Sequence, residues 1–78
     1  MKKIKIFTTP TCTYCNQAKE FFIENNIKFD AVDVSKDKNA AKEMIKISGQ
    51  MGVPVILIEG HKPIIGFDQE EIEEILNL

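Results

Sequence analysis

The sequence is poor in the residues that build metal centres and disulfide frameworks. Its 78 residues include two cysteines and one histidine, and no tryptophan. A closed structural zinc site takes four Cys or His ligands, which is more than this chain offers. The one possible intrachain disulfide would close a loop of about four residues, and so short a loop contributes little stability through chain entropy. We therefore expect no metal in a monomer and a fold that is held together by packing.

The chain also lacks long apolar runs and blocks of basic residues. Lys2, Lys3 and Lys5 resemble the start of a signal peptide, but no apolar run of adequate length follows them. Ten basic and twelve acidic residues are mixed along the sequence, and no basic block is interleaved with aromatic residues. The sequence therefore predicts a cytoplasmic protein without a nucleic-acid or membrane partner. Ordinary thiols stay reduced in that compartment, which favours a catalytic or metal-binding use of a cysteine pair.

Length and patterning predict one domain that spans residues 1–78. A chain this short has no room for a second core, and its hydrophobic fraction of 44% is enough for one. Apolar and charged residues alternate over residues 3–7, apolar residues recur at helical spacing over residues 13–25, and residues 28–34 predict a second strand. A strand, a helix and a strand within about thirty residues make a right-handed βαβ unit.

The second half of the chain continues with a helix, two strands and a helix. Periodicity predicts a helix over residues 40–48, and the apolar run 53–58 predicts a central strand that is covered on both faces. Pro63 cannot donate a ladder hydrogen bond, so residues 63–65 are expected to form a short edge strand. The last helix starts after a capping residue, Asp68. The resulting order, βαβαββα, predicts one small layered α/β domain.

The two cysteines, Cys12 and Cys15, lie where the first strand gives way to the first helix. Side chains at this spacing on a helix are roughly 5–6 Å apart, so the two thiols can close to a disulfide and reopen without a large backbone movement. A lone CxxC motif is also compatible with half of a metal site, a permanent structural disulfide or two inert buried thiols. The polar residues around the motif indicate an exposed turn, and thiol–disulfide chemistry is the interpretation that they favour.

The position of Cys12 at the start of a helix predicts that it is the reactive thiol. Unpaired backbone N–H groups and the positive end of the helix dipole both stabilise a thiolate. Cys15 lies one turn further along and faces the fold, so we expect its pKa to stay higher. A thiol of lowered pKa gains ionised fraction but loses intrinsic nucleophilicity, so its main advantage is as a leaving group. These properties suit a reversible redox carrier.

Three motifs in register carry a resemblance to a known family. The sequences C-T-Y-C after the first strand, G-V-P-V before the central strand and I-G-F-D before the last helix together resemble those of glutaredoxins. The resemblance covers nearly the whole chain and keeps the order of its elements. It implies the thioredoxin fold, with a four-stranded mixed sheet flanked by three helices, and the activity of a thiol–disulfide oxidoreductase.

The resemblance also implies roles for individual residues. Cys12 corresponds to the nucleophile and Cys15 to the resolving thiol, with glutathione as a co-substrate and no bound cofactor or metal. In glutaredoxins the peptide bond before the proline of the second motif is cis, and the residue before it pairs with the cysteinyl group of glutathione. Asp68 would bind the ammonium group at the γ-glutamyl end. The implied glutathione-binding residues are Tyr14, Val53, Pro54, Gly66, Phe67 and Asp68.

Several of these residues also have purely structural interpretations. Tyr14 can be the first packing residue of its helix, and Asp68 can be a helix cap alone. Phe67 and Ile72 have the spacing of a hydrophobic staple across the start of the last helix. His61 is interpreted as a solvated turn residue without a role in the site.

The motifs depart from the usual glutaredoxin pattern at positions that bear on the partner. Thr13 stands where many glutaredoxins have proline, Thr9 where many have lysine or arginine, and Gly52 where threonine is usual. The later motif partly resembles the glutaredoxin-like electron donors of ribonucleotide reductase, which take electrons from thioredoxin reductase.

Two alternatives therefore accompany the main interpretation. We expect a monomer that reduces disulfide-containing proteins or glutathione mixed disulfides, with glutathione or another low-molecular-weight thiol as reductant. The first alternative is an electron donor to ribonucleotide reductase that is fed by thioredoxin reductase. The second, from another class, is a dimeric carrier that holds a [2Fe–2S] cluster on Cys12 of each subunit and two further thiols.

Overall fold

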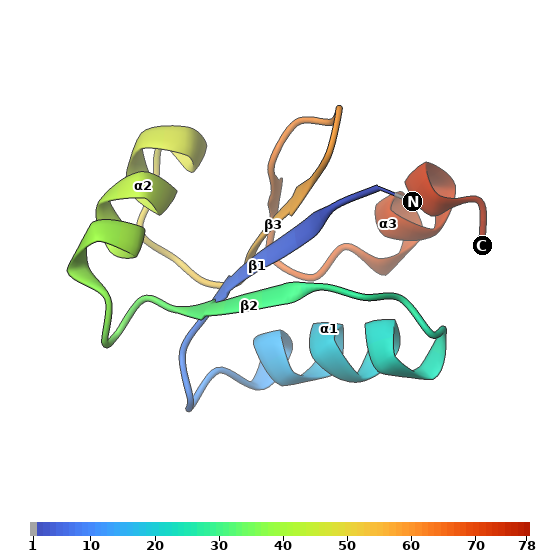
Figure 1. Ribbon diagram of the computed structural model, residues 1–78, viewed down its shortest axis with the longest axis horizontal. Helices are drawn as coiled ribbons and strands as arrows, with labels where there is room; N and C mark the ends of the chain where they lie inside the picture. Colours follow the sequence, from blue (N-terminus) through green and yellow to red (C-terminus); the bar gives the residue numbers. More distant parts are fainter. Residues whose placement is uncertain (1) are drawn as a thin grey trace.

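The protein is described here by a computed structural model covering residues 2–78, in which a four-stranded sheet lies between two layers of helices (Figure 1). The strands are β1 (Ile4–Thr8), β2 (Asp30–Asp33), β3 (Val55–Ile58) and β4 (Ile64–Ile65), and the helices are α1 (Thr13–Glu24), α2 (Lys38–Ser48) and α3 (Gln69–Leu76). In the strand order β2-β1-β3-β4, β1 is parallel to β2 and antiparallel to β3, and β3 is antiparallel to β4. The predicted mixed sheet and element order are confirmed.

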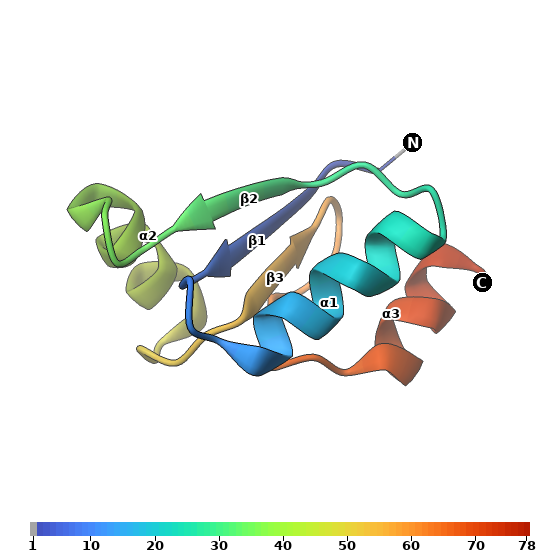
Figure 2. The same ribbon diagram turned by 90° about the horizontal axis from the view of Figure 1, so that it is seen from below.

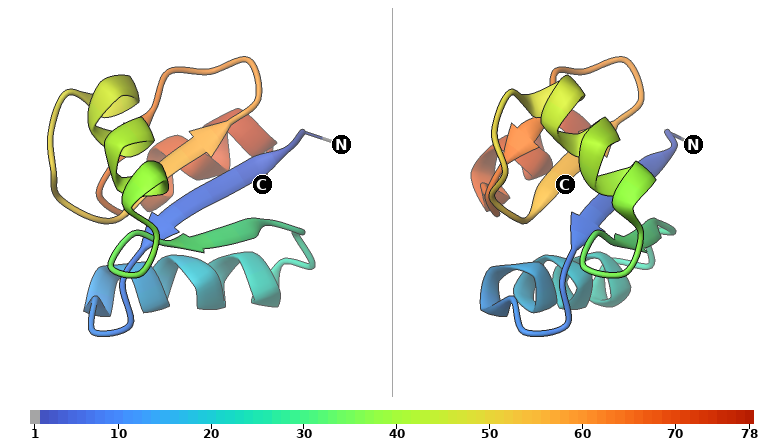
Figure 3. Two further views of the ribbon diagram at one scale, coloured as in Figure 1. Left: turned by 60° about the vertical axis from the view of Figure 1, so that its left-hand side comes forward. Right: turned by 90° about the vertical axis from the view of Figure 1, so that its left-hand side faces the viewer.

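Helices α1 and α3 cover one face of the sheet, and α2 covers the other (Figures 2 and 3). The cluster on the α1 and α3 side consists of Ile4, Ile6, Ala18, Phe22, Ile56, Ile58, Ile64 and Ile72. The cluster on the α2 side consists of Phe7, Ala40, Met44 and Val55. Alternate residues of β3 enter the two clusters, as expected for a strand whose successive side chains point to opposite faces. The prediction of a central strand covered on both faces is therefore confirmed.

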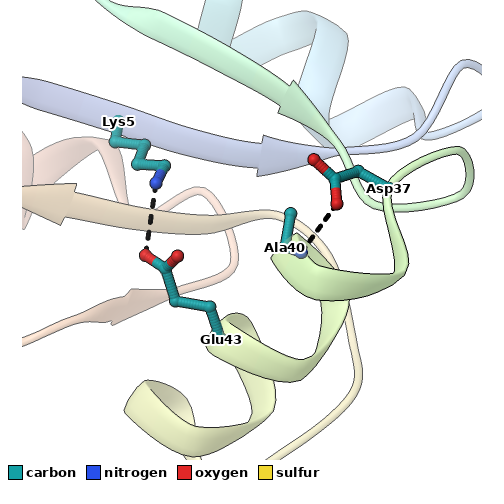
Figure 4. Close-up of polar contacts among 4 residues, drawn as sticks. All are labelled: Lys5, Asp37, Ala40 and Glu43. Atoms are coloured by element: carbon teal, nitrogen blue, oxygen red, sulfur yellow. Dashed lines mark hydrogen bonds and ion pairs between the residues drawn. The ribbon is translucent and has the colours of Figure 1, made fainter.

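Three elements begin two residues away from the start that the sequence predicted, and one of them is β2, which begins at Asp30 rather than at residue 28. Helix α2 begins at Lys38 rather than at residue 40, because the Asp37 carboxylate accepts a hydrogen bond from the Ala40 N–H group at 3.0 Å and caps the helix (Figure 4). Strand β3 begins at Val55 rather than at residue 53, since Pro54 has no N–H group to donate to the ladder. The Val53–Pro54 peptide bond is cis, as the family resemblance implied.

The remaining boundaries agree closely with the expected ones. Helix α2 ends at Ser48 and is capped by Gly49, which adopts a left-handed conformation (φ 74°) that glycine tolerates without steric cost. Strand β4 lies at the edge of the sheet, where Pro63 was expected to place it. Within residues 2–78, none of the helices combines the length and the apolar character that a membrane span requires.

Candidate active site

The topology of the sheet brings three loop segments to one end of the molecule. Phe7, near the end of β1, pairs with Val55, the first residue of β3, and Val55 also pairs with Ile65, the last residue of β4. The segments that follow β1, precede β3 and follow β4 therefore leave the sheet at the same end. The Gly66 N–H group donates a hydrogen bond to the Pro54 carbonyl at 2.8 Å and ties the last two segments together. All eight residues that the sequence nominated lie in these segments or in the first turn of α1.

The cysteines form a disulfide at the start of α1. Cys12 is the N-cap residue, with extended backbone (φ −85°, ψ 110°), and the Cα atoms of Cys12 and Cys15 are 5.2 Å apart. The Cys15 N–H group donates to Cys12 Sγ over 3.1 Å, and the Cys12 N–H group donates to the Thr9 carbonyl over 3.3 Å. Sulfur thus takes the place that a serine or aspartate oxygen holds in an ordinary helix cap. The predicted closure of the two thiols is confirmed.

The two sulfur-bearing residues differ sharply in accessibility. Cys15 is 0% exposed and lies on the buried face of α1 with Ala18 and Phe22, whereas Cys12 is partly exposed. An incoming thiol or disulfide can therefore approach the sulfur of Cys12 but not that of Cys15. This asymmetry divides the pair into an outer and an inner sulfur, as a nucleophile and a resolving thiol require.

Large apolar side chains are exposed on the segments at the disulfide end. Tyr14 is 64% exposed, Met51 77% and Ile65 56%. The exposure of Tyr14 shows that its interpretation as a packing residue of α1 is wrong. Met51 and Ile65 were not singled out from the sequence, although each lies next to a glycine in a motif segment. Exposed apolar residues around a reactive group are typical of a surface that contacts a partner.

The segment after β4 combines structural bonds with an exposed carboxylate. The Asp68 carboxylate accepts a hydrogen bond from the Glu71 N–H group at 3.2 Å, which confirms the helix cap. Phe67 is half-buried, its ring centroid lies 5.8 Å from that of Phe21, and it packs against the cluster that contains Ile72. Asp68 itself is exposed, so a cap and a ligand contact are compatible in the same side chain.

The opposite end of the sheet holds a hollow but no thiol. A hollow of about 660 Å³ is lined by Lys2, Lys3, Ile4, Ile27, Lys28, Phe29 and Asp30. His61 is exposed in the nearby turn, with Nε2 3.1 Å from Lys2 Nζ, so its interpretation as a solvated turn residue is confirmed. Among residues 2–78, no three histidine, cysteine or carboxylate side chains converge where a metal ion could bind.

Comparison with known proteins agrees with this geometry. The family model for glutaredoxins matches residues 4–62. An uncharacterized glutaredoxin-like 8.6 kDa protein in the rubredoxin operon of Clostridium pasteurianum is 44% identical over 73 residues, which are 94% of this chain and 96% of the relative. Glutaredoxin 3 of Escherichia coli K12 is 41% identical over 61 residues, which are 76% of this chain and 71% of the relative. A mutant of the thioredoxin-like protein BC3987 superposes with a TM-score of 0.88 at 32% identity, covering 99% of this chain and 97% of the other. The chain belongs to the glutaredoxin family.

Proposed function

We propose that the protein is a cytoplasmic, monomeric thiol–disulfide oxidoreductase in which Cys12 attacks and Cys15 resolves. The observation that carries the proposal is the asymmetry of the pair, since an outer sulfur caps a helix while the inner sulfur is fully buried one turn away. A disulfide that closes so short a loop contributes little to the stability of the fold, so stability alone does not explain this arrangement.

The reaction is an exchange of sulfur partners in two steps. In the dithiol form, the Cys12 thiolate attacks one sulfur of a substrate disulfide, a mixed disulfide forms and the other substrate sulfur leaves as a thiolate. Cys15 then loses its proton and attacks Cys12 Sγ, which closes the intramolecular disulfide and releases the second substrate thiolate. Two electrons pass from the protein to the substrate. Two molecules of a thiol such as glutathione return them and leave as a disulfide.

The start of α1 supplies the electrostatic part of this mechanism. The Cys15 N–H group lies 3.1 Å from Cys12 Sγ, and the first turn of the helix contributes further N–H groups that have no partner within the helix. When the disulfide opens, the same groups and the helix dipole favour the thiolate of Cys12 over the thiol. The leaving-group ability of Cys12 in the mixed disulfide rises for the same reason.

The residues around the disulfide support glutathione as the first candidate for the reductant. The backbone of Val53, before the cis Pro54, is available to pair with the cysteinyl group of glutathione, and Tyr14 stands exposed beside Cys12. Gly66 and Phe67 lead to the exposed carboxylate of Asp68, which can receive the ammonium group of the γ-glutamyl end. The proposed binding residues are thus the six that the family motifs nominated.

A specific observation favours a second candidate, an electron donor to a protein such as ribonucleotide reductase that is itself reduced by thioredoxin reductase. Met51, Ile65 and Tyr14 offer exposed apolar area, which suits a protein surface better than the charged glutathione molecule. Thr9 moreover offers no cation to a glutathione carboxylate. Turnover with glutathione and its reductase, compared with turnover with thioredoxin reductase alone, separates the two candidates.

The proposal is tested with Cys15→Ser assayed on two substrates. We expect reduction of a glutathionylated peptide to survive, because glutathione can resolve the mixed disulfide on Cys12. Reduction of a protein disulfide should fall by on the order of 100-fold, because the internal resolving step is lost. Cys12→Ser is the matched control and should abolish both activities. Loss of both activities in Cys15→Ser would contradict the proposed mechanism.

A further inference from the structure

The fold gathers acidic residues from two parts of the sequence in the layer formed by α1 and α3. The layer of α1 and α3, with the cap of α3, contains seven acidic residues and one lysine, Lys19, for a net charge of −6. The rest of the chain contains nine lysines and five acidic residues, for a net charge of +4, which completes the total of −2. The seven acidic residues are Glu20, Glu24, Asp68, Glu70, Glu71, Glu73 and Glu74.

The basic side is most concentrated along α2. Residues 36–48 carry four exposed lysines, and Lys38, Lys42 and Lys46 follow one another at intervals of four residues. Residues at this spacing form one stripe on a helix. The buried residues Ala40 and Met44 lie on the opposite side of the helix, so the stripe faces solvent.

The acidic residues of this segment are occupied by partners within the protein (Figure 4). The Asp37 carboxylate accepts the Ala40 N–H hydrogen bond that caps α2, and Glu43 Oε1 lies 3.2 Å from Lys5 Nζ. This ion pair is the only one within residues 2–78. The three lysines of the stripe therefore direct their charge toward solvent, and Lys36 is exposed near Asp33, whose pKa it helps to lower.

The lysine-bearing connection before α2 lies at the disulfide end of the sheet. Thr8 pairs with Asp33, and the Val34 N–H group donates to the Thr8 carbonyl at 3.0 Å. The chain thus leaves β2 beside the residue from which β1 leads to Cys12. Figures 1 and 3 show the connection from β2 to α2 at the end where α1 begins. The disulfide therefore lies between a basic side, at α2, and an acidic side, at α3.

We propose that Lys36, Lys38, Lys42 and Lys46 form a docking surface, here called the lysine side, for a protein redox partner with an acidic segment beside its reactive cysteine. The inference rests on the proposed function, because the partner must exchange its sulfur at Cys12. The lysine side attracts the acidic segment while the α3 side repels it. The two forces raise the rate of encounter and also orient the partner over the disulfide.

The test compares the reduction rates of three peptide disulfides that differ only in the residues beside their cysteine: three aspartates, three serines or three lysines. We expect the reduced protein to react with the aspartate peptide roughly tenfold faster than with the lysine peptide at about 0.01 M salt. The difference should shrink severalfold at about 0.1 M salt, because the screening length falls from about 30 to about 10 Å. Equal rates with the aspartate and lysine peptides at low salt would overturn the proposal.

Charge reversal at the lysine side provides the decisive variant. We expect Lys36→Glu/Lys38→Glu to lower the rate of reduction of the aspartate peptide by about tenfold at low salt. The rate of reduction of the serine peptide should stay unchanged. Glutamate next to the first turn of α2 is favoured by the helix dipole, so the helix should stay folded. The neutral variant Lys36→Gln/Lys38→Gln should also slow the reduction of the aspartate peptide. The decrease in the logarithm of the rate should be about half as large, because two charges are removed rather than reversed.

Lys28→Glu/Lys62→Glu is the matched control, because it makes the same change in net charge at the other end of the sheet. Lys28 precedes β2, and Lys62 follows β3. An equal loss of rate in this control would overturn the proposal in favour of a net-charge effect. Self-association of the wild-type protein at low salt that disappears in the Lys36→Glu/Lys38→Glu variant would also overturn it, since a second copy would then occupy the lysine side. If the reduced wild-type protein does not reduce the serine peptide, that result would instead contradict the proposed oxidoreductase function.

Discussion

Between the sheet and helices α1 and α3 lies a cluster of eight buried residues, whereas the cluster beneath α2 contains four. The larger cluster includes Phe22 and Ile72, which are 0% exposed, and α1 also carries the buried Cys15. The α2 side is thinner and carries exposed lysines on its outer surface. The two sides therefore differ in role. The α1 and α3 side holds the two cysteines in place, and the α2 side presents the lysines that we propose to contact a partner.

The largest expected effect is that of Phe22→Ala. The side chain is fully buried, and its ring centroid lies 5.4 Å from that of Phe29 and 5.8 Å from that of Phe21. Removal of a buried phenylalanine side chain costs about 3–5 kcal/mol through lost transfer energy and the cavity left behind. Urea unfolding of the reduced protein measures the loss, and a cost below about 1.5 kcal/mol would show that the larger cluster does not dominate stability.

Met44→Ala makes the equivalent change beneath α2 and should cost less. Met44 is 2% exposed and belongs to the smaller cluster with Phe7, Ala40 and Val55. We expect about 2 kcal/mol, at the low end for such substitutions, since methionine is flexible and the thin layer can collapse into the space. The same unfolding measurement applies, and a cost equal to that of Phe22→Ala would remove the distinction between the two sides.

Removal of a helix cap on either side of the sheet should cause a loss of stability of intermediate size. Asp37→Ala and Asp68→Ala each remove one cap, from α2 and α3 respectively, and each should cost about 1 kcal/mol. Asp37→Ala is the control for function, because its carboxylate lies on the α2 side. If Asp68 also binds glutathione, only Asp68→Ala should raise the KM for glutathione. Equal KM values in the two variants would leave Asp68 as a cap alone.

The smallest expected effect is a pH dependence at the end of β2. The hydrogen bond from the Ser35 hydroxyl, with smaller contributions from backbone N–H groups and Lys36, holds the pKa of Asp33 below its usual value of 3.8. A carboxylate whose pKa is lowered by folding stabilises the protein fully above pH 3.8, and this contribution is lost as the pH falls through the folded-state pKa. The Tm of wild type should therefore exceed that of Asp33→Asn at neutral pH, and the gap should close in acid. A gap that widens in acid would contradict this assignment.

The sequence was sufficient to predict the elements with strong periodicity and the chemistry of the cysteine pair. Alternation predicted β1, and the apolar run after residue 52 predicted the central strand β3. The first two residues of α2 were missed because Lys38 and Asn39 are both polar and exposed. The hydrogen bond that the Asp37 carboxylate accepts from the Ala40 N–H group shows the start of the helix. Patterns of hydrophobicity record which residues are buried, so exposed polar residues at the start of a helix are not detected by them.

Other parts of the site could not be predicted from local pattern at all. The cis bond before Pro54 came from the family resemblance, because only about 5–6% of such bonds are cis in folded proteins. The exposure of Met51 and Ile65 depends on which loops the sheet brings together. The separation of charge is partly visible in the sequence, because five of the seven acidic residues of the α1 and α3 layer lie together at 68–74. The topology adds Glu20 and Glu24 to the same layer, since α1 and α3 take one face of the sheet and α2 the other.

The ionisation of Cys12 in the reduced protein is the most direct test of how the start of α1 makes this sulfur reactive. The rate of alkylation by iodoacetamide, measured against pH in the Cys15→Ser variant, reports the thiolate of Cys12 alone. We expect a midpoint below about 7 in the folded protein, and one near 8.5 once urea has unfolded the helix, as in free cysteine. A midpoint near 8.5 in the folded protein would show that the helix start does not stabilise the thiolate, and would contradict the proposed mechanism.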